Sequence, residues 1–202
     1  MATRIEIKST STPAPVGQTL MKTGQTTSYR TGDDGDLEAG RTVSFTVLEN
    51  HNPFGNTNRF TDTSGGQTYP NNIVIDWSTY DGTTVNGWYR LAMPTVGTYT
   101  WNQAIDAGLA FTIASFTTGW RLANVAEYFS LYNFANPPAN KLNYAPFNLV
   151  ADLWTSTTAE NNNINAFYSV NSVTVPFTQV GKTAGIKALF VRTFTVTGTT
   201  LT

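Results

Sequence analysis

Short hydrophobic runs separated by turn-forming residues dominate both ends of the chain. Runs of β-branched, aromatic and aliphatic residues favour strands, and the clusters of Asn, Gly and Pro between them mark turns. Such clusters lie at 52–56 and 64–66, with a further loop predicted at 159–163 and a turn at 180–182. The predicted strands cover residues 42–48, 73–77, 87–93, 153–157, 166–170, 173–177 and 186–196.

Helical spacing is confined to the middle of the chain. Thr100 is a suitable N-cap for a helix that begins at Trp101, and the apolar positions of this helix share one face. These positions are Trp101, Ala104, Ile105 and Leu109. A second helix is predicted to begin at Asn124, because Asn124 and Glu127 resemble a capping box. It continues through Tyr128, Leu131 and Tyr132 and is stopped by Asn136, Pro137 and Pro138.

The order of these elements predicts an α+β fold. Strands come first, two helices follow, and strands return, which favours a twisted antiparallel sheet over a βαβ repeat. We expect two parts along the chain: an N-terminal arm or tether at 1–20, which contains two prolines, and one folded domain at 21–202. The arm has two open interpretations, a disordered tail or a segment that docks on a partner.

Charge and composition limit the kinds of partner that we expect for this chain. Only 12% of residues are charged, against about 25% in ordinary soluble domains, while the chain contains 35 Thr and 19 Asn. The formal net charge of −1 supplies no basic surface for phosphates, so we expect no nucleic-acid partner. No apolar run approaches the length of about 18 residues that a membrane span needs, and the start lacks the pattern of an export signal. We therefore expect no membrane insertion.

The sequence predicts no enzyme. It has no cysteine, and its one histidine, His51, lies in a predicted loop without a nucleophile motif. Phosphate-binding and dinucleotide-binding glycine motifs are absent. Spacing alone does not bring two of the acidic residues together, so a carboxylate pair for sugar hydrolysis is not supported.

Binding is better supported than catalysis. Neutral amides and hydroxyls beside aromatic rings suit sugar ligands and adaptable protein contacts. The candidate ligand-binding residues are Asn161, Asn162, Asn163, Asn165, Trp77, Tyr80, Asp81 and Trp88. The alternative for each tryptophan is a place in the core, and for the Asn run a plain loop.

An acidic turn is the candidate metal site. Asp33, Asp34, Asp36 and Glu38 are closely spaced on glycine-rich backbone and could offer oxygen ligands to Ca²⁺. The segment lacks the spacing of an EF-hand loop, so the alternative is a solvated turn. We expect no other cofactor.

Several segments, in order, resemble the Lcl C-terminal domain family of bacteria and phages. They span roughly 20–195, and in two places the chain departs from the family pattern, with Ala123 in place of a usual Pro and Thr193 in place of a frequent Cys. The segments are Lys22-Thr23-Gly24-Gln25-Thr26, Gly32-Asp33-Asp34-Gly35-Asp36-Leu37, Thr100-Trp101-Asn102-Gln103-Ala104, Gly119-Trp120-Arg121-Leu122, Glu127, Ser130-Leu131, Leu153-Trp154-Thr155-Ser156-Thr157-Thr158 and Phe190-Val191-Arg192.

The resemblance implies a C-type-lectin-like fold and a role in surface display and adhesion. It fixes no ligand-binding position. We therefore expect a phage virion protein, made in the host cytoplasm without a signal peptide. It would be a fibre-type or receptor-binding module on tail or head that attaches to a bacterial surface glycan or protein. The arm would join other virion proteins, and the module would be a homo-oligomer, with a trimer expected. The alternatives are a structural virion decoration or joining protein and, less favoured, a bacterial surface adhesin.

Overall fold

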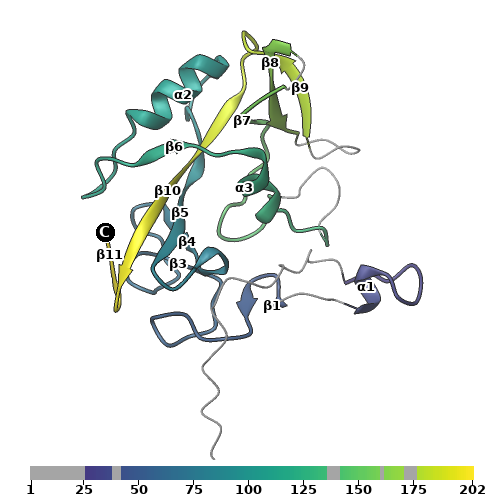
Figure 1. The fold of residues 1–202 in the computed structure, drawn as a ribbon, viewed down its shortest axis with the longest axis vertical. Coiled ribbons are helices and arrows are strands. Elements are labelled where there is room, and N and C mark those ends of the chain that lie inside the picture. The colour runs from purple at the N-terminus through teal and green to yellow at the C-terminus, as the bar shows by residue number, and fades with distance from the viewer. Residues whose placement is uncertain (1–25, 38–41, 136–141, 160–161, 171–176) are drawn as a thin grey trace, which may run out of the picture.

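The structure is a computed structural model that describes residues 26–37, 42–135, 142–159, 162–170 and 177–202. Its elements, in chain order, are α1 (Asp34–Leu37), β1 (Thr42–Ser44), β2 (Val47–Leu48), β3 (Phe60–Thr61), β4 (Ile73–Asp76), the 3-10 turn η1 (Trp77–Thr79), β5 (Thr84–Met93), α2 (Trp101–Leu109), β6 (Trp120–Leu122), α3 (Val125–Ser130), β7 (Leu153–Ala159), β8 (Asn162–Ser169), β9 (Phe177–Gly181), β10 (Lys187–Thr197) and β11 (Thr200–Leu201). The predicted α+β class is confirmed: a large twisted sheet accompanies the helices α2 and α3 (Figure 1).

Strand β10 runs through the middle of the larger sheet (Figure 1). One of its edges pairs with β5, and the opposite edge pairs in turn with β7, β6 and β11. The path across this sheet is β3-β4-β5-β10-β7-β8-β9, while β1 and β2 form a separate two-stranded sheet. Residues far apart in the chain therefore meet on β10.

The expectation of an antiparallel sheet is wrong for one strand pair. β7 and β10 are parallel, with Lys187 opposite Leu153 and Ala188 opposite Trp154. The other pairings between these strands are antiparallel. A parallel pair needs a long connection between its strands. Here the segment between β7 and β10 contains β8 and β9, which extend the sheet beyond β7 before the chain returns.

The central strands are buried on both faces. Because side chains alternate along a strand, successive residues enter different cores. Ile73, Ile75 and Phe190 belong to a core that includes α2. Val74 and Val191 belong to a second core, which includes α3. This two-sided burial explains why the sequence of these strands reads as a continuous apolar run.

The helix α2 has the predicted start and, apart from Leu109, the predicted core-facing residues: Ala104 is buried, and Trp101 and Ile105 pack against the same core. The Thr100 hydroxyl accepts the backbone N–H of Gln103, whose side chain accepts the N–H of Thr100, so a full capping box is present. Ala104 and Gly108 are the buried residues of the helix. The prediction that Leu109 lies on that face is wrong, because its side chain is 66% exposed. The face of α2 that carries Gly108 lies directly against the backbone of β6, which leaves Leu109 on the exposed side of the helix.

The helix α3 also begins where predicted. Asn124 accepts the N–H of Glu127 at 2.9 Å, and the Glu127 carboxylate accepts the N–H of Asn124 at 2.9 Å. The same carboxylate pairs with the guanidinium of Arg121, which fixes β6 against the helix start. Tyr128 and Leu131 are fully buried, as the spacing predicts.

Several boundaries differ from the prediction. The strand expected at 42–48 is two strands with a turn between them, and the loop expected at 159–163 is partly strand, since β7 extends to Ala159 and β8 begins at Asn162. Strands β3, β6 and β11 have only two or three residues each, too few to show the alternation of apolar and polar residues by which a strand is predicted. The helix expected to continue to 136–138 ends earlier, at Ser130, so this part of the prediction is wrong. The arm at 1–20 and most of the strand expected at 173–177 lie outside the described residues. Every helix in the described ranges is too short or too polar to span a bilayer.

Candidate functional site

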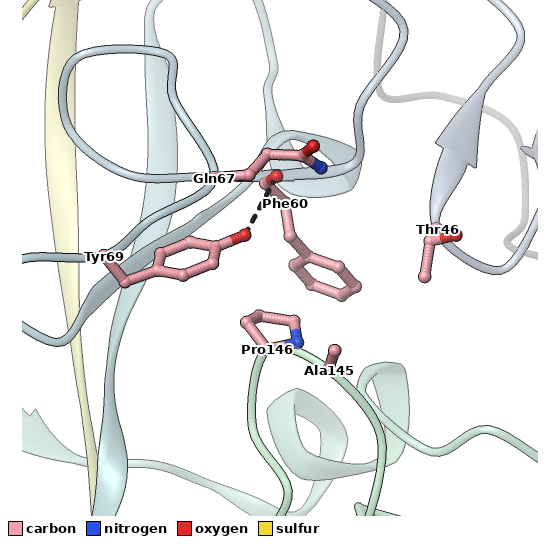
Figure 2. A pocket seen from close by; sticks show the side chains of 6 residues that line it. All are labelled: Thr46, Phe60, Gln67, Tyr69, Ala145 and Pro146. Atoms are coloured by element: carbon pink, nitrogen blue, oxygen red, sulfur yellow. Dashed lines mark hydrogen bonds between the residues drawn. The ribbon is translucent and has the colours of Figure 1, made fainter.

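A pocket opens between the segment that carries β3 and the loop before Phe147. Its cavity volume is about 340 Å³, which lies at the lower end of the range of roughly 300–1,000 Å³ for ligand pockets. In Figure 2 the rings of Tyr69, Phe60 and Pro146 gather around the centre, and Thr46 lies on the side away from Tyr69. The lining residues are Thr46, Phe60, Gln67, Tyr69, Ala145 and Pro146.

Tyr69 forms one wall of the pocket, with an unusual backbone conformation and a hydrogen bond at the hydroxyl end of its side chain. Its backbone φ is 51°, in the left-handed region that a bulky residue rarely adopts. Its hydroxyl donates to the carbonyl oxygen of Phe60 at 3.1 Å, the dashed line in Figure 2. Burial, with a smaller contribution from the charge of Asp62, raises the pKa of the Tyr69 phenol to about 12, against the opposing effect of Arg90. The hydroxyl is therefore neutral at physiological pH.

Arg90 of β5 holds two sides of the pocket together. Its Nε donates to Oδ1 of Asn72 at 2.9 Å, and its Nη1 donates to the carbonyl oxygen of Pro146 at 3.1 Å. The guanidinium carbon also lies 6.0 Å from the centre of the Tyr69 ring. Arg90 thus ties the Tyr69 wall to the Pro146 wall through its ring contact and the hydrogen bonds of Nε and Nη1.

Asp62 orders the loop that carries Gln67. Its Oδ1 accepts the backbone N–H of Ser64 at 2.7 Å, the hydroxyl of Ser64 at 2.7 Å and the N–H of Gly66 at 2.9 Å. The N–H of Asp62 in turn donates to the carbonyl of Gly66 at 2.7 Å. This closed turn presents the exposed side chain of Gln67 at the rim.

The floor of the pocket belongs to the core on the α3 side of the sheet. Phe60 is 3% exposed and packs edge-on against Phe147, with ring centres 5.6 Å apart. Its other neighbour is the buried guanidinium of Arg59, 4.5 Å from the ring centre. The backbone N–H of Arg59 donates to the carbonyl of Thr46 at 2.9 Å, which sets the position of the opposite rim.

This arrangement suits binding of a neutral ligand. The walls are apolar rings, and the polar groups at the rim are an amide and a hydroxyl. Among the described residues that line the pocket there is no carboxylate, imidazole, amine or guanidinium side chain, so these residues supply no acid and base pair for proton transfer. Of the eight residues predicted to bind ligand, none whose side chain the structure describes lines this pocket.

The two predicted tryptophans lie in the core. Trp77 and Trp88 are both 0% exposed. The indole N–H of Trp77 donates to the hydroxyl of Thr61 at 2.8 Å, whereas Nε1 of Trp88 has no hydrogen-bond partner among the described residues. Neither ring offers a surface to an external ligand in this structure.

Tyr80 and Asp81 form a tight turn before β5. The Tyr80 hydroxyl donates to the carbonyl of Gly82 at 2.8 Å. The Asp81 carboxylate accepts the backbone N–H and hydroxyl groups of Thr83 and Thr84. These hydrogen bonds, those from the backbone above all, hold the pKa of Asp81 well below its ordinary value. Asp81 is therefore engaged by its own turn.

The Asn-rich candidates lie on β8 or just before it. Asn163 is exposed, and Asn165 is half-buried opposite Gly181 of β9. Asn161 lies outside the described residues, as does the side chain of Asn162. A ligand role for this strand stays a prediction.

The acidic turn uses its oxygens for its own backbone. Asp33 accepts the N–H groups of Tyr29, Arg30 and Asp36, and Asp36 accepts the N–H of Gly32 at 2.8 Å. The bond from Tyr29 contributes most to a pKa of Asp33 below its ordinary value. In the described part of the chain no three His, Cys, Asp or Glu residues form a group that could hold a metal.

The side chain of Asp34 and all of Glu38 lie outside the described residues.

The pocket residues were missed because Phe60 and Pro146 cannot be distinguished from ordinary core and loop residues by their spacing. The one usable signal was the turn at 62–66, in which an Asp precedes Ser and two glycines.

Neither a comparison with protein families nor a search of curated proteins finds a match to this chain.

Proposed function

We propose that this protein is a virion-displayed binding module with a C-type-lectin-like fold, which attaches a phage to the bacterial surface. The single observation that carries the proposal is the pocket between Tyr69 and Pro146, whose neutral lining suits recognition rather than catalysis. The segments that resemble the Lcl C-terminal domain family, which occur in the order of that family, and the low proportion of charged residues support the same proposal. The residues at 1–20 would join other virion proteins.

Attachment through such a module gains from several copies. A small pocket binds weakly, and several copies on one particle raise the overall affinity without any new contact. We therefore propose a homo-oligomer, with a trimer as the expected form. Sedimentation of the full chain at several concentrations tests this part on its own.

The decisive experiment measures binding of the labelled full chain to a panel of bacterial cells and purified surface glycans. Gln67→Ala removes the rim amide of the pocket, and Gln179→Ala, at an exposed position on β9, is the matched control. Saturable binding that falls in Gln67→Ala alone supports a receptor-binding module. A folded protein that binds no cell and no glycan contradicts it.

A structural decoration or joining protein is the second candidate. Phe129 of α3 is 49% exposed and has ring contacts to Phe134 and Phe177, with ring centres 5.4 Å and 6.4 Å away. Such an aromatic surface suits packing against another protein. Deletion of residues 1–20 distinguishes the two functions: a receptor-binding module loses virion incorporation but keeps cell binding, whereas a joining protein has no cell binding to keep.

A further inference from the structure

We infer that the pocket between Tyr69 and Pro146 binds a single neutral sugar ring. This inference deepens the proposed function and rests on it, because it names the chemical class that the attachment site recognises.

The walls match the apolar faces of a sugar. A pyranose ring presents C–H groups on its faces and hydroxyls around its edge. Figure 2 shows the rings of Tyr69, Phe60 and Pro146 turned toward the same space. The C–H groups on one face of a sugar can therefore pack against these rings, while the hydroxyls at the edge of the sugar stay outside the apolar part of the pocket. The Tyr69 ring is held by the hydrogen bond to Phe60 and does not have to be ordered on binding.

The rim offers hydrogen bonds of the correct kind. The side chains of Gln67 and Thr46 are exposed, and among the described residues neither has a hydrogen-bond partner. An amide donates and accepts at once, as does a hydroxyl, so both can bond to the hydroxyls of a sugar. The Asp62 turn and the Arg59 N–H fix the backbone beneath them, which keeps the two groups on opposite sides of the opening.

The charge of the lining selects against anionic ligands. Two guanidinium groups lie behind the walls: that of Arg90 donates to Asn72 and to the Pro146 carbonyl, and that of Arg59, beneath Phe60, is paired with Asp76. A carboxylate or phosphate in the pocket would lose its water without meeting a cationic side chain among the described lining residues, which is costly. Neutral hexoses and N-acetylhexosamines therefore fit better than uronic acids or phosphorylated sugars.

The size of the pocket is sufficient for one sugar ring. A cavity of about 340 Å³ is at the small end of the pockets that hold drug-sized molecules, which bury most of their surface. The open side would let the next sugar of a chain leave toward solvent. Recognition of a terminal or branching residue of a longer glycan follows from this shape.

The test is ligand-observed NMR on the full chain, with methyl glycosides of neutral hexoses and N-acetylhexosamines as probes and methyl glucuronide as the charged comparison. We expect at least one neutral glycoside to bind weakly and the glucuronide not to bind. Gln67→Ala should weaken the affinity about 3- to 10-fold, the effect of one lost hydrogen bond. Gln179→Ala should leave it unchanged.

Ala145→Trp supplies a second variant. Ala145 lines the pocket and is exposed, so an indole there should fill the cavity without disturbing the core. We expect binding to fall by more than tenfold while the near-ultraviolet circular dichroism of the other aromatic residues is kept.

Three results would overturn the inference: no neutral glycoside binds the folded protein, the glucuronide binds as well as the neutral probes, or Gln67→Ala and Ala145→Trp both bind like the wild type. Failure of the proposed function looks different. There, the isolated protein binds a neutral glycoside through Gln67, but it neither binds cells nor occurs in virions.

Discussion

The guanidinium of Arg59 and the carboxylate of Asp76 form a two-pronged ion pair inside the protein, with Nε to Oδ1 at 2.9 Å and Nη2 to Oδ2 at 2.8 Å. Both side chains are 0% exposed. The rings of Phe45 and Phe60 lie 4.4 Å and 4.5 Å from the guanidinium carbon. The same guanidinium donates to the carbonyl of Ser130, the last residue of α3, so the pair links β3 and β4 to that helix.

Removing one partner of this pair should be severely destabilising. Arg59→Met leaves the Asp76 carboxylate buried without its cation and should lower the free energy of unfolding by about 3–5 kcal/mol. Urea unfolding followed by tryptophan fluorescence measures the change. The exposed Arg30→Met is the control and should stay within about 0.5 kcal/mol of the wild type. A loss below about 1 kcal/mol in Arg59→Met would contradict the structural importance given to the pair.

Glycine at position 108 is required by the close approach of α2 to β6. A Cβ there would lie 2.7 Å from the backbone nitrogen of Leu122 and 2.9 Å from the carbonyl carbon of Arg121. Backbone atoms cannot move aside as a side chain can, so Gly108→Ala should cost about 1–3 kcal/mol despite the better helix propensity of alanine. Asp106→Ala, exposed on the same helix, should be nearly neutral. Equal thermal unfolding midpoints for the two variants would count against this contact.

The two helix starts show which features a sequence can predict. The sequence predicts Thr100 as an N-cap and Asn124 with Glu127 as a capping box; both caps are confirmed, and Gln103 completes a capping box at Thr100 as well. A cap depends on groups within one turn, so its signal is local. The face of a helix that becomes buried is decided by its neighbours, which explains why Leu109 was assigned to the wrong side.

The pocket and the ion pair depend on contacts that local patterns do not contain. Arg59 and Asp76 are separated by 17 positions, and either alone has the sequence signature of a surface charge. Phe60 and Pro146 meet only because the chain crosses the sheet several times between them. The parallel pairing of β7 with β10 was missed for the same reason, since strand direction is set by the connections rather than by alternation. The burial of Trp77 and Trp88 agrees with the common fate of tryptophan in a core of this size.

The N-cap of α3 should contribute measurably to stability. Asn124→Ala removes the oxygen that accepts the N–H of Glu127 and should lower the free energy of unfolding by about 1 kcal/mol. Asn124→Ser restores an acceptor and should recover most of that loss. Both values come from urea unfolding at neutral pH. If Asn124→Ser is as unstable as Asn124→Ala, the loss does not arise from capping.

Calcium should have no effect on folding stability. The carboxylates of Asp33 and Asp36 already accept four backbone N–H groups, which occupy about half of their lone-pair sites and hold both side chains toward their own turn. We expect equal thermal unfolding midpoints in excess calcium and in excess chelator. Asp36→Asn keeps an acceptor for the N–H of Gly32 and serves as the control. A midpoint that rises with calcium in the wild type but not in Asp36→Asn would establish the metal site that the sequence suggested.

Tyr69 should titrate late and make stability fall at alkaline pH. Its pKa is raised to about 12, whereas an unfolded tyrosine titrates near 10. The folded protein therefore holds this proton more tightly than the unfolded chain. Its contribution to stability is complete below about pH 10 and is lost as the pH rises toward about 12.

Tyr69→Phe keeps the ring but removes the titrating group and the hydrogen bond to Phe60. The phenolate absorbance of the wild type minus that of the variant isolates this one tyrosine, since Tyr128, Tyr132 and Tyr144 also have raised pKa values. We expect the difference to have its midpoint near pH 12, or to coincide with unfolding where the protein unfolds first. Tryptophan fluorescence recorded on the same samples separates these two cases. A difference midpoint near pH 10 in protein that is still folded would mean that the phenol is solvated and the wall of the pocket is open there.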